Sequence, residues 1–117
     1  MLFVCYSKCS TCAKARAWLE AQGIPVTSRD IKADRPTVLE LRAWHTASGL
    51  PIRKLFNTSG LQYKALGLKD KLDAMSEDEQ YELLASDGML VRRPILVGDG
   101  FALFGFREAA WVERISS

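Results

Sequence analysis

Residues 2–21 read LFVCYSKCSTCAKARAWLEA, and this stretch decides the fold. Its first five residues, Leu2 to Tyr6, form a short apolar run rich in β-formers, which is typical of a strand covered on both faces. From Ala13 onward, strong helix formers mix apolar and charged side chains until Gly23 and Pro25 end the pattern. The stretch therefore predicts a buried strand that leads directly into a helix.

A CxxC motif, Cys9 and Cys12, lies where the strand gives way to the helix. Unpaired backbone N–H groups and the positive end of the helix dipole favour an anion there, and Lys8 supplies a nearby cation. Such settings lower the pKa of a thiol from ~8.5 to about 3.5–7.5. We predict that Cys9 is the nucleophile and that Cys12, one turn further into the helix, is the resolving partner.

Three other interpretations of the pair stay open. Half of a zinc site is disfavoured because the chain has no second CxxC and its single histidine, His45, is far along the sequence. A structural disulfide of an exported domain is disfavoured by three cysteines and no secretory signal pattern. The third alternative is an inert buried pair. Cys5, inside the strand run, is interpreted as a core residue, and His45 as a helix-surface residue; no bound metal or cofactor is expected.

Length and composition indicate one ordinary globular domain. The 117 residues are 48% hydrophobic and carry a net charge of only +2, with basic residues dispersed among acidic ones. This pattern does not favour nucleic-acid binding, and no apolar run has membrane-spanning length. We expect a cytoplasmic protein with reduced thiols, monomeric, with no nucleic-acid or membrane partner.

Beyond residue 25 the pattern changes from strand to helix and back again. A strand is predicted over 25–31, followed by an almost wholly helical region that contains two capping boxes, Thr37 to Glu40 and Ser76 to Glu79. Asp99-Gly100 is a strong hairpin signal. Around it we predict strands over 94–97 and 101–104, and then an amphipathic helix over 107–115.

This order of elements is that of a thioredoxin-like α/β fold, in which βαβ and ββα halves build a mixed four-stranded sheet. A CxxC motif beside a βαβ unit is the sequence signal for a redox-active protein with that fold. We predict a single domain over 1–117, with the thioredoxin-like core in about 1–32 and 92–117. A helical insertion over about 33–91 separates the two halves.

Two arginines are candidate anion ligands. Thioredoxin-like folds that this chain resembles place a cis-proline before the third strand, facing the nucleophilic cysteine, so we expect Pro94 to be cis and Arg93 to point toward Cys9. Arg107 opens the last helix, where a cation opposes the helix dipole, which indicates another role. Arg93, Arg107 and the first helix start are predicted to hold an anion together. The alternative is that Arg92 and Arg93 are only solvated.

Three segments carry a resemblance to a known family: YSKCSTCAKARAWL at 6–19, RRPI at 92–95 and GFRE at 105–108. The chain resembles the ArsC/Spx family over essentially its whole length. That family contains ArsC-type arsenate reductases, YffB-type thiol reductases and Spx-type RNA polymerase regulators.

The resemblance to the arsenate reductases assigns roles to individual residues. Their attacking cysteine matches Cys9, and two of their three oxyanion-binding arginines match Arg93 and Arg107, whereas the third falls where this chain has Asn57. Those reductases usually lack a cysteine at the position of Cys12. The leading hypothesis is a thiol-dependent reductase, linked to glutaredoxin or thioredoxin, that holds a small oxyanion or the carboxylate of a thiol co-substrate such as glutathione.

The resemblance to Spx-type regulators gives a second hypothesis. These regulators share the CxxC, where a disulfide acts as a switch, and bind the C-terminal domain of the RNA polymerase α-subunit. Gly49 lies near the glycine that they use at that contact. A redox-switched transcriptional regulator is therefore the alternative.

Overall fold

One mixed sheet forms the centre of the molecule in the computed structural model, which describes residues 1–116. Its strands are β1 (Leu2–Cys5), β2 (Thr27–Asp30), β3 (Ile95–Gly98) and β4 (Phe101–Phe104). The order across the sheet is β2-β1-β3-β4; β1 runs parallel to β2 and antiparallel to β3, and β3 is antiparallel to β4. The predicted thioredoxin-like α/β arrangement is confirmed.

The turn between β3 and β4 is the predicted hairpin, although β3 extends one residue further than the predicted strand, to Gly98. Gly98 pairs with Phe101, so Asp99 and Gly100 alone form the loop. Gly100 has φ +79°, a left-handed conformation that glycine adopts without a steric penalty.

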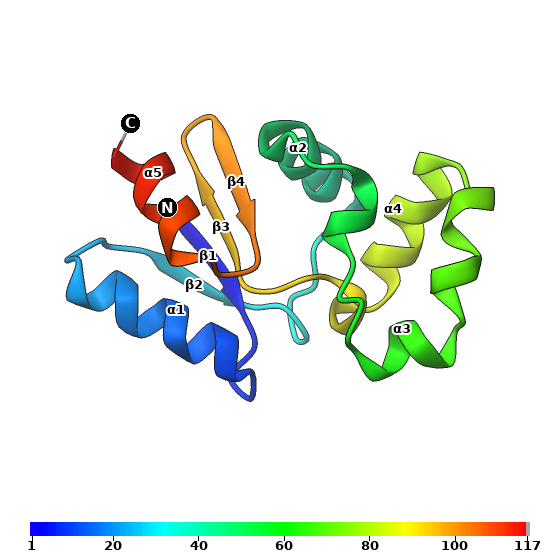
Figure 1. Cartoon of the computed structure of the whole chain (residues 1–117), viewed down its shortest axis with the longest axis horizontal. Helices are drawn as coiled ribbons and strands as arrows, with labels where there is room; N and C mark the ends of the chain where they lie inside the picture. The colour runs from blue at the N-terminus through cyan, green and yellow to red at the C-terminus, as the bar shows by residue number, and fades with distance from the viewer. Residues whose placement is uncertain (117) are drawn as a thin grey trace.

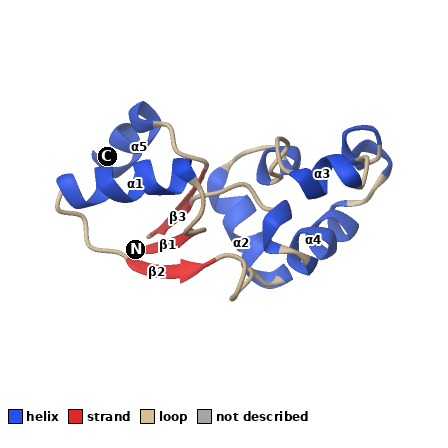
Figure 2. Ribbon diagram, turned by 90° about the horizontal axis from the view of Figure 1, so that it is seen from below, coloured by secondary structure: helices blue, strands red, loops and turns tan. Residues whose placement is uncertain are grey.

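The central strand β1 is covered on both faces, as its apolar run predicts. Phe3 and Cys5 point to one face, which α1 (Ser10–Ala21) and α5 (Glu108–Ser116) cover through Leu19 and Trp111. Val4 points to the opposite face, where the residues between β2 and β3 pack. Figures 1 and 2 show α1 and α5 together on one side of the strands and α2 on the other.

The second face of the sheet is covered by the helical region that follows β2. Its elements are α2 (Val38–Ser48), η1 (Ile52–Leu55), α3 (Leu61–Ala65), η2 (Leu68–Asp70), η3 (Leu72–Ala74), α4 (Glu77–Ser86) and η4 (Gly88–Leu90), where η marks a 3-10 helix. Both predicted capping boxes are present, at Thr37 and Ser76. Leu41 and Leu84 from this region share one buried core with Val4 and Ile95 of the sheet.

The expectation for His45 is wrong, because this side chain is half-buried between α2 and α4. Its Nδ1 contacts the hydroxyl of Tyr81, and its Nε2 lies 2.7 Å from the carbonyl oxygen of Leu50. Because α2 and α4 pack against each other, the His45 ring contacts Tyr81 of α4. The sequence of α2 by itself could not predict this contact.

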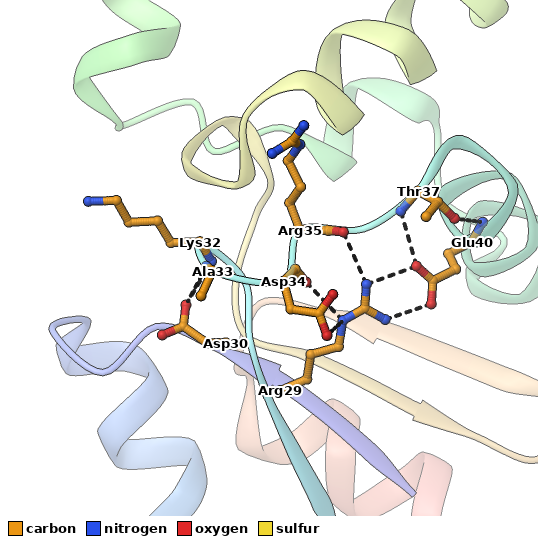
Figure 3. A network of polar contacts seen from close by, with 8 residues as sticks. All are labelled: Arg29, Asp30, Lys32, Ala33, Asp34, Arg35, Thr37 and Glu40. Atoms are coloured by element: carbon orange, nitrogen blue, oxygen red, sulfur yellow. Dashed lines mark hydrogen bonds and ion pairs between the residues drawn. The ribbon is translucent and has the colours of Figure 1, made fainter.

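Arg29 on β2 ties the edge of the sheet to the start of the helical region (Figure 3). Its guanidinium donates two hydrogen bonds to the carboxylate of Glu40, and it also donates to the carbonyl oxygens of Asp34 and Arg35. The Arg29 side chain is only 15% exposed. The hydrogen bond from Arg29 is the main reason that the pKa of Glu40 falls to about 2.

We expect Glu40→Gln to lower the free energy of unfolding by about 1–3 kcal/mol at neutral pH, because it leaves the half-buried Arg29 without its charged partner. The pKa of a glutamate in the unfolded chain is ~4.3, so the stabilisation from the Arg29–Glu40 pair is present above that pH. It is lost as the pH falls toward the pKa of about 2 that Glu40 has in the folded protein. Urea unfolding at pH 7 and in acid measures both effects. Asp78→Asn, at an exposed ion pair with Arg42, is the control and should change little. Equal stability of wild type and Glu40→Gln at pH 7 would contradict the account.

Candidate functional site

Cys9 is the N-cap residue of α1, as the sequence predicts. Its backbone is extended, with φ −98° and ψ 121°, and its carbonyl oxygen accepts the first helical hydrogen bond, from the N–H of Ala13 at 3.1 Å. The first turn of the helix, Ser10 to Cys12, contains no acidic side chain. The half-buried Cys9 sulfur therefore lies where free N–H groups and the helix dipole stabilise a negative charge.

The pKa of Cys9 is lowered below that of an ordinary cysteine. Burial is the largest single influence and acts in the opposite direction, but four others outweigh it together. These are hydrogen bonds from the backbone N–H and the thiol of Cys12, the positive charge of Arg93, and a hydrogen bond from the backbone N–H of Thr11. The local geometry thus favours the Cys9 thiolate.

Cys12 has the opposite character. Its side chain is 3% exposed, and burial is the main cause that raises its pKa to about 12. The neighbouring Cys9 and Cys5 add to the effect of burial and raise the pKa of Cys12 further. The Sγ of Cys12 accepts a hydrogen bond from the backbone N–H of Tyr6 at 3.3 Å. Cys5, Cys9 and Cys12 are all free thiols in this structure. The pair therefore combines a thiol whose ionisation is favoured with a second thiol that ionises poorly and hydrogen-bonds to the first.

The Cys9 sulfur opens on a cavity of about 650 Å³. Four segments that are distant in the sequence form its wall: the start of α1, the connection from η1 into α3, the residues before β3 and those after β4. The lining residues are Cys9, Thr11, Phe56, Asn57, Thr58, Ser59, Gly60, Leu61, Gln62, Met89, Arg92, Arg93, Gly105 and Phe106. In Figure 1 the start of α1 is drawn in dark blue and the segment that leads into α3 in green.

Arg93 projects an unsatisfied cation into the site. Its peptide bond to Pro94 is cis, and its guanidinium lies 5.3 Å from the centre of the Tyr6 ring. Within residues 1–116, the buried Nε and Nη1 atoms of Arg93 have no hydrogen-bond partner. Burial of a donor without a partner costs about 1–3 kcal/mol, and the surrounding protein does not offset this cost for the two atoms.

Arg92 and residues 58–62 also line the cavity, although we predicted no binding role for them from the sequence. A Cβ at Gly105 would lie 2.6 Å from the Nε of Arg92, and Gly105 has φ +76°, so glycine at this position leaves room for that side chain. A glycine directly after β4 is the signal from which this approach could have been inferred.

Asn57 lies in the cavity wall opposite the cysteine. Its backbone N–H donates to the carbonyl oxygen of Leu90 at 2.8 Å, and its side-chain oxygen accepts a hydrogen bond from Ser59. Lys8 and Arg107 have exposed side chains and do not line the cavity. Arg107 instead accepts the first hydrogen bond of α5 through its carbonyl oxygen. The structure thus brings Cys9, Cys12, Asn57 and Arg93 together and leaves Lys8 and Arg107 outside the cavity.

No cluster of three or more histidine, cysteine, aspartate or glutamate side chains within residues 1–116 is arranged to hold a metal ion. No helix in this part of the chain is long and apolar enough to cross a membrane.

The positive charge of Arg93 near Cys9 leads to a prediction. We expect Arg93→Gln to raise the pKa of Cys9, so that its pH profile of alkylation moves to higher pH and alkylation near neutral pH becomes slower. Iodoacetamide labelling followed by peptide mapping measures this profile. Lys8→Gln, which removes an exposed cation outside the cavity, is the matched control. A larger shift in Lys8→Gln than in Arg93→Gln would contradict the assignment.

The mixed sheet, the cis-proline before β3 and the thiol at the start of α1 together define a thioredoxin-like protein with a cysteine-centred site. The chain belongs to the ArsC family, whose model matches residues 5–114.

Comparison with known proteins places it among relatives with different descriptions. YusI, an uncharacterized protein of Bacillus subtilis, is 47% identical over 97% of both chains. The regulatory protein MgsR of the same organism is 30% identical, over 91% of this chain and 82% of MgsR.

Solved structures agree with the fold. An ArsC family related protein from Bacteroides fragilis superimposes with a TM-score of 0.94 at 51% identity, covering 96% of this chain and 94% of that one. The arsenate reductase from Vibrio cholerae gives a TM-score of 0.82 at 32% identity, with 98% of each chain covered. The family therefore includes proteins described as reductases and proteins described as regulators.

Proposed function

We propose that this protein is a thiol-dependent reductase in which Cys9 attacks the substrate and Cys12 resolves the intermediate as a disulfide. The observation that carries the proposal is the position of the Cys9 sulfur. It lies at the start of α1 with a lowered pKa and opens on a cavity of about 650 Å³ beside the unpartnered N–H groups of Arg93. A stabilised thiolate that faces a roomy, cationic cavity suits attack on a small electrophile.

With a small disulfide as substrate, the Cys9 thiolate attacks one sulfur, the substrate S–S bond breaks and one thiolate leaves. The Cys12 thiol then gives its proton to that first thiolate and attacks the Cys9 sulfur. The bond between Cys9 and the substrate breaks, and the second half of the substrate leaves as a thiolate that takes a proton from solvent. The negative charge and hydrogen bonding of Cys9 contribute to the high pKa of Cys12. Because the mixed disulfide removes that charge, Cys12 becomes easier to ionise at the step in which it attacks.

Arg93 and its neighbours would position the substrate. Its guanidinium, which lines the cavity, suits a carboxylate of glutathione or the oxygens of an oxyanion such as arsenate, and Arg92 and Asn57 line the same cavity. We further propose that the protein acts as a cytoplasmic monomer. Glutathione, glutaredoxin or thioredoxin would reduce the Cys9–Cys12 disulfide.

A coupled assay tests this function. NADPH oxidation is followed with arsenate as substrate and a glutathione/glutaredoxin or a thioredoxin system as reductant, and with glutathione disulfide as substrate and the thioredoxin system as reductant. We expect turnover that depends on the protein with at least one substrate. No turnover above the protein-free rate with any pair would contradict the proposal.

A redox-switched regulator is the second candidate, because MgsR and the Staphylococcus epidermidis regulator Spx match 91% and 86% of this chain. In this role the Cys9–Cys12 disulfide would be a switch, and the partner would be the C-terminal domain of the RNA polymerase α-subunit. The exposed Gly49, which ends α2 with φ +68°, would lie at that contact. Capture of the purified α-subunit domain by the oxidised or reduced protein would support this role, and no capture by either would exclude it.

A further inference from the structure

The third cysteine lies next to the resolving one. Cys5 is at the end of β1 and points to the face covered by α1, where it belongs to the same buried cluster as Cys12. The Sγ of Cys12 accepts its hydrogen bond from the N–H of Tyr6, which places this sulfur against the peptide bond between Cys5 and Tyr6. The three thiols therefore form one cluster with Cys12 in the middle.

The two cysteines of the CxxC motif open on different cavities. Cys9 lines the larger one, whereas Cys12 and Cys5 both line a second cavity of about 380 Å³. Its other lining residues are Tyr6, Ser7, Ala13, Arg16, Ala17 and Glu20. A disulfide between Cys5 and Cys12 would thus face a cavity that the substrate site does not include.

Arg16 is held against the sulfur of Cys5. One of its terminal nitrogens donates to the Sγ of Cys5 at 3.0 Å, and the other donates to the hydroxyl of Ser28, also at 3.0 Å. Its guanidinium also lies 5.2 Å from the centre of the Phe3 ring. Arg16 thus fixes a positive charge beside the Cys5 sulfur, on the wall of the second cavity.

We propose that Cys5 is a third thiol of the redox cycle, which attacks the Sγ of Cys12 in the Cys9–Cys12 disulfide and carries the disulfide to the second cavity. The Cys5–Cys12 S–S bond forms, the Cys9–Cys12 bond breaks, and Cys9 leaves as a thiolate. The proton of the Cys5 thiol passes to solvent, and no net oxidation occurs. The exchange rests on the proposed function, since substrate reduction is what produces the Cys9–Cys12 disulfide.

The direction of attack follows from the two possible leaving groups. Attack on the Sγ of Cys12 expels Cys9, whose thiolate is stabilised by the helix start and Arg93, whereas attack on Cys9 would expel the poorly ionising Cys12. The thiol with the lower pKa leaves faster. The exchange therefore restores the Cys9 thiolate in the substrate cavity and moves the disulfide to the second cavity, where its reductant would act.

Trypsin cleavage after Lys8 makes the exchange directly measurable, because it separates Cys5 in peptide 1–8 from Cys9 and Cys12 in peptide 9–14. Reduced wild-type protein is oxidised with one equivalent of diamide, a small thiol oxidant, or with glutathione disulfide. It is then quenched in acid, alkylated in denaturant and digested. We expect peptide 1–8 disulfide-linked to peptide 9–14 with the alkyl group on Cys9, besides the internal Cys9–Cys12 disulfide.

Complete alkylation of Cys5 in every diamide-treated sample would overturn the proposal. The cross-link with diamide but no oxidation by glutathione disulfide would instead support the exchange while contradicting reduction of that disulfide as the function. We expect Arg16→Gln to slow formation of the cross-link roughly tenfold, because the charged hydrogen bond to Cys5 is lost. Lys14→Gln, at an exposed cation on the same helix, should leave the rate unchanged. In that variant the cleavage site at residue 14 is lost, so the linked peptide is 9–16. An equal rate in Arg16→Gln and wild type would overturn the role of Arg16.

Discussion

Replacement of Cys9 by serine is expected to reduce turnover in the coupled assay by at least about a hundredfold. A serine hydroxyl is not ionised near neutral pH, so the helix start and Arg93 no longer stabilise a nucleophile. Cys12 is 3% exposed, and burial, the main cause that raises its pKa, remains in the variant, so we do not expect it to take over the attack. The measurement is the initial rate of NADPH oxidation under saturating reductant.

The control for this substitution is Ser10→Ala, at the exposed first residue of α1. It changes the neighbouring side chain without touching the sulfur, and its rate should match that of the wild type. Full turnover in Cys9→Ser would show that the reaction does not pass through this thiol.

The second large effect is on stability, at Gly88. This buried glycine begins η4, where the helical region returns to the sheet, and a Cβ there would lie 1.9 Å from the carbonyl oxygen of Ile31. Backbone rather than a flexible side chain blocks the space, so η4 must move away from the end of β2 to accommodate a methyl group. We expect Gly88→Ala to lower the free energy of unfolding by roughly 3 kcal/mol or more.

Urea unfolding followed by circular dichroism measures the loss. Gly100→Ala in the hairpin is the matched control, because its Cβ meets nothing within 4 Å and only its φ of +79° is unfavourable. That variant should lose about 1 kcal/mol. Equal losses in the two variants would show that the close approach of Gly88 to Ile31 does not matter.

Local sequence patterns predicted the helices, strands and turns of this fold well, because the signals that specify each element lie within the residues that make it up. Asp99-Gly100 makes the hairpin by itself, and each capping box is complete within four residues. Local patterns did not predict the environment of His45, because its partner Tyr81 comes from another helix. The helix boundary and the CxxC spacing likewise placed Cys9 at the N-cap without any tertiary information.

The cavity could be predicted only in part, because long-range hydrogen bonds assemble it. The N–H of Arg92 donates to the carbonyl oxygen of Leu55, and the N–H of Asn57 donates to that of Leu90, so two distant segments meet opposite Cys9. Nearness in the sequence was also a poor guide to side-chain position. Lys8 precedes Cys9 directly but is exposed, while Arg93 supplies the charge that acts on the sulfur.

The central claim is that Cys9 attacks and Cys12 resolves, and trapping of the mixed disulfide tests it most directly. In Cys12→Ser protein the resolving thiol is absent, so incubation with glutathione disulfide should leave one glutathione attached to Cys9, as shown by the mass of the intact protein and of peptide 9–14. Wild-type protein treated in the same way should release that glutathione and form an internal disulfide. Absence of an adduct on Cys9 in Cys12→Ser, or attachment of glutathione to Cys5 instead, would contradict the account.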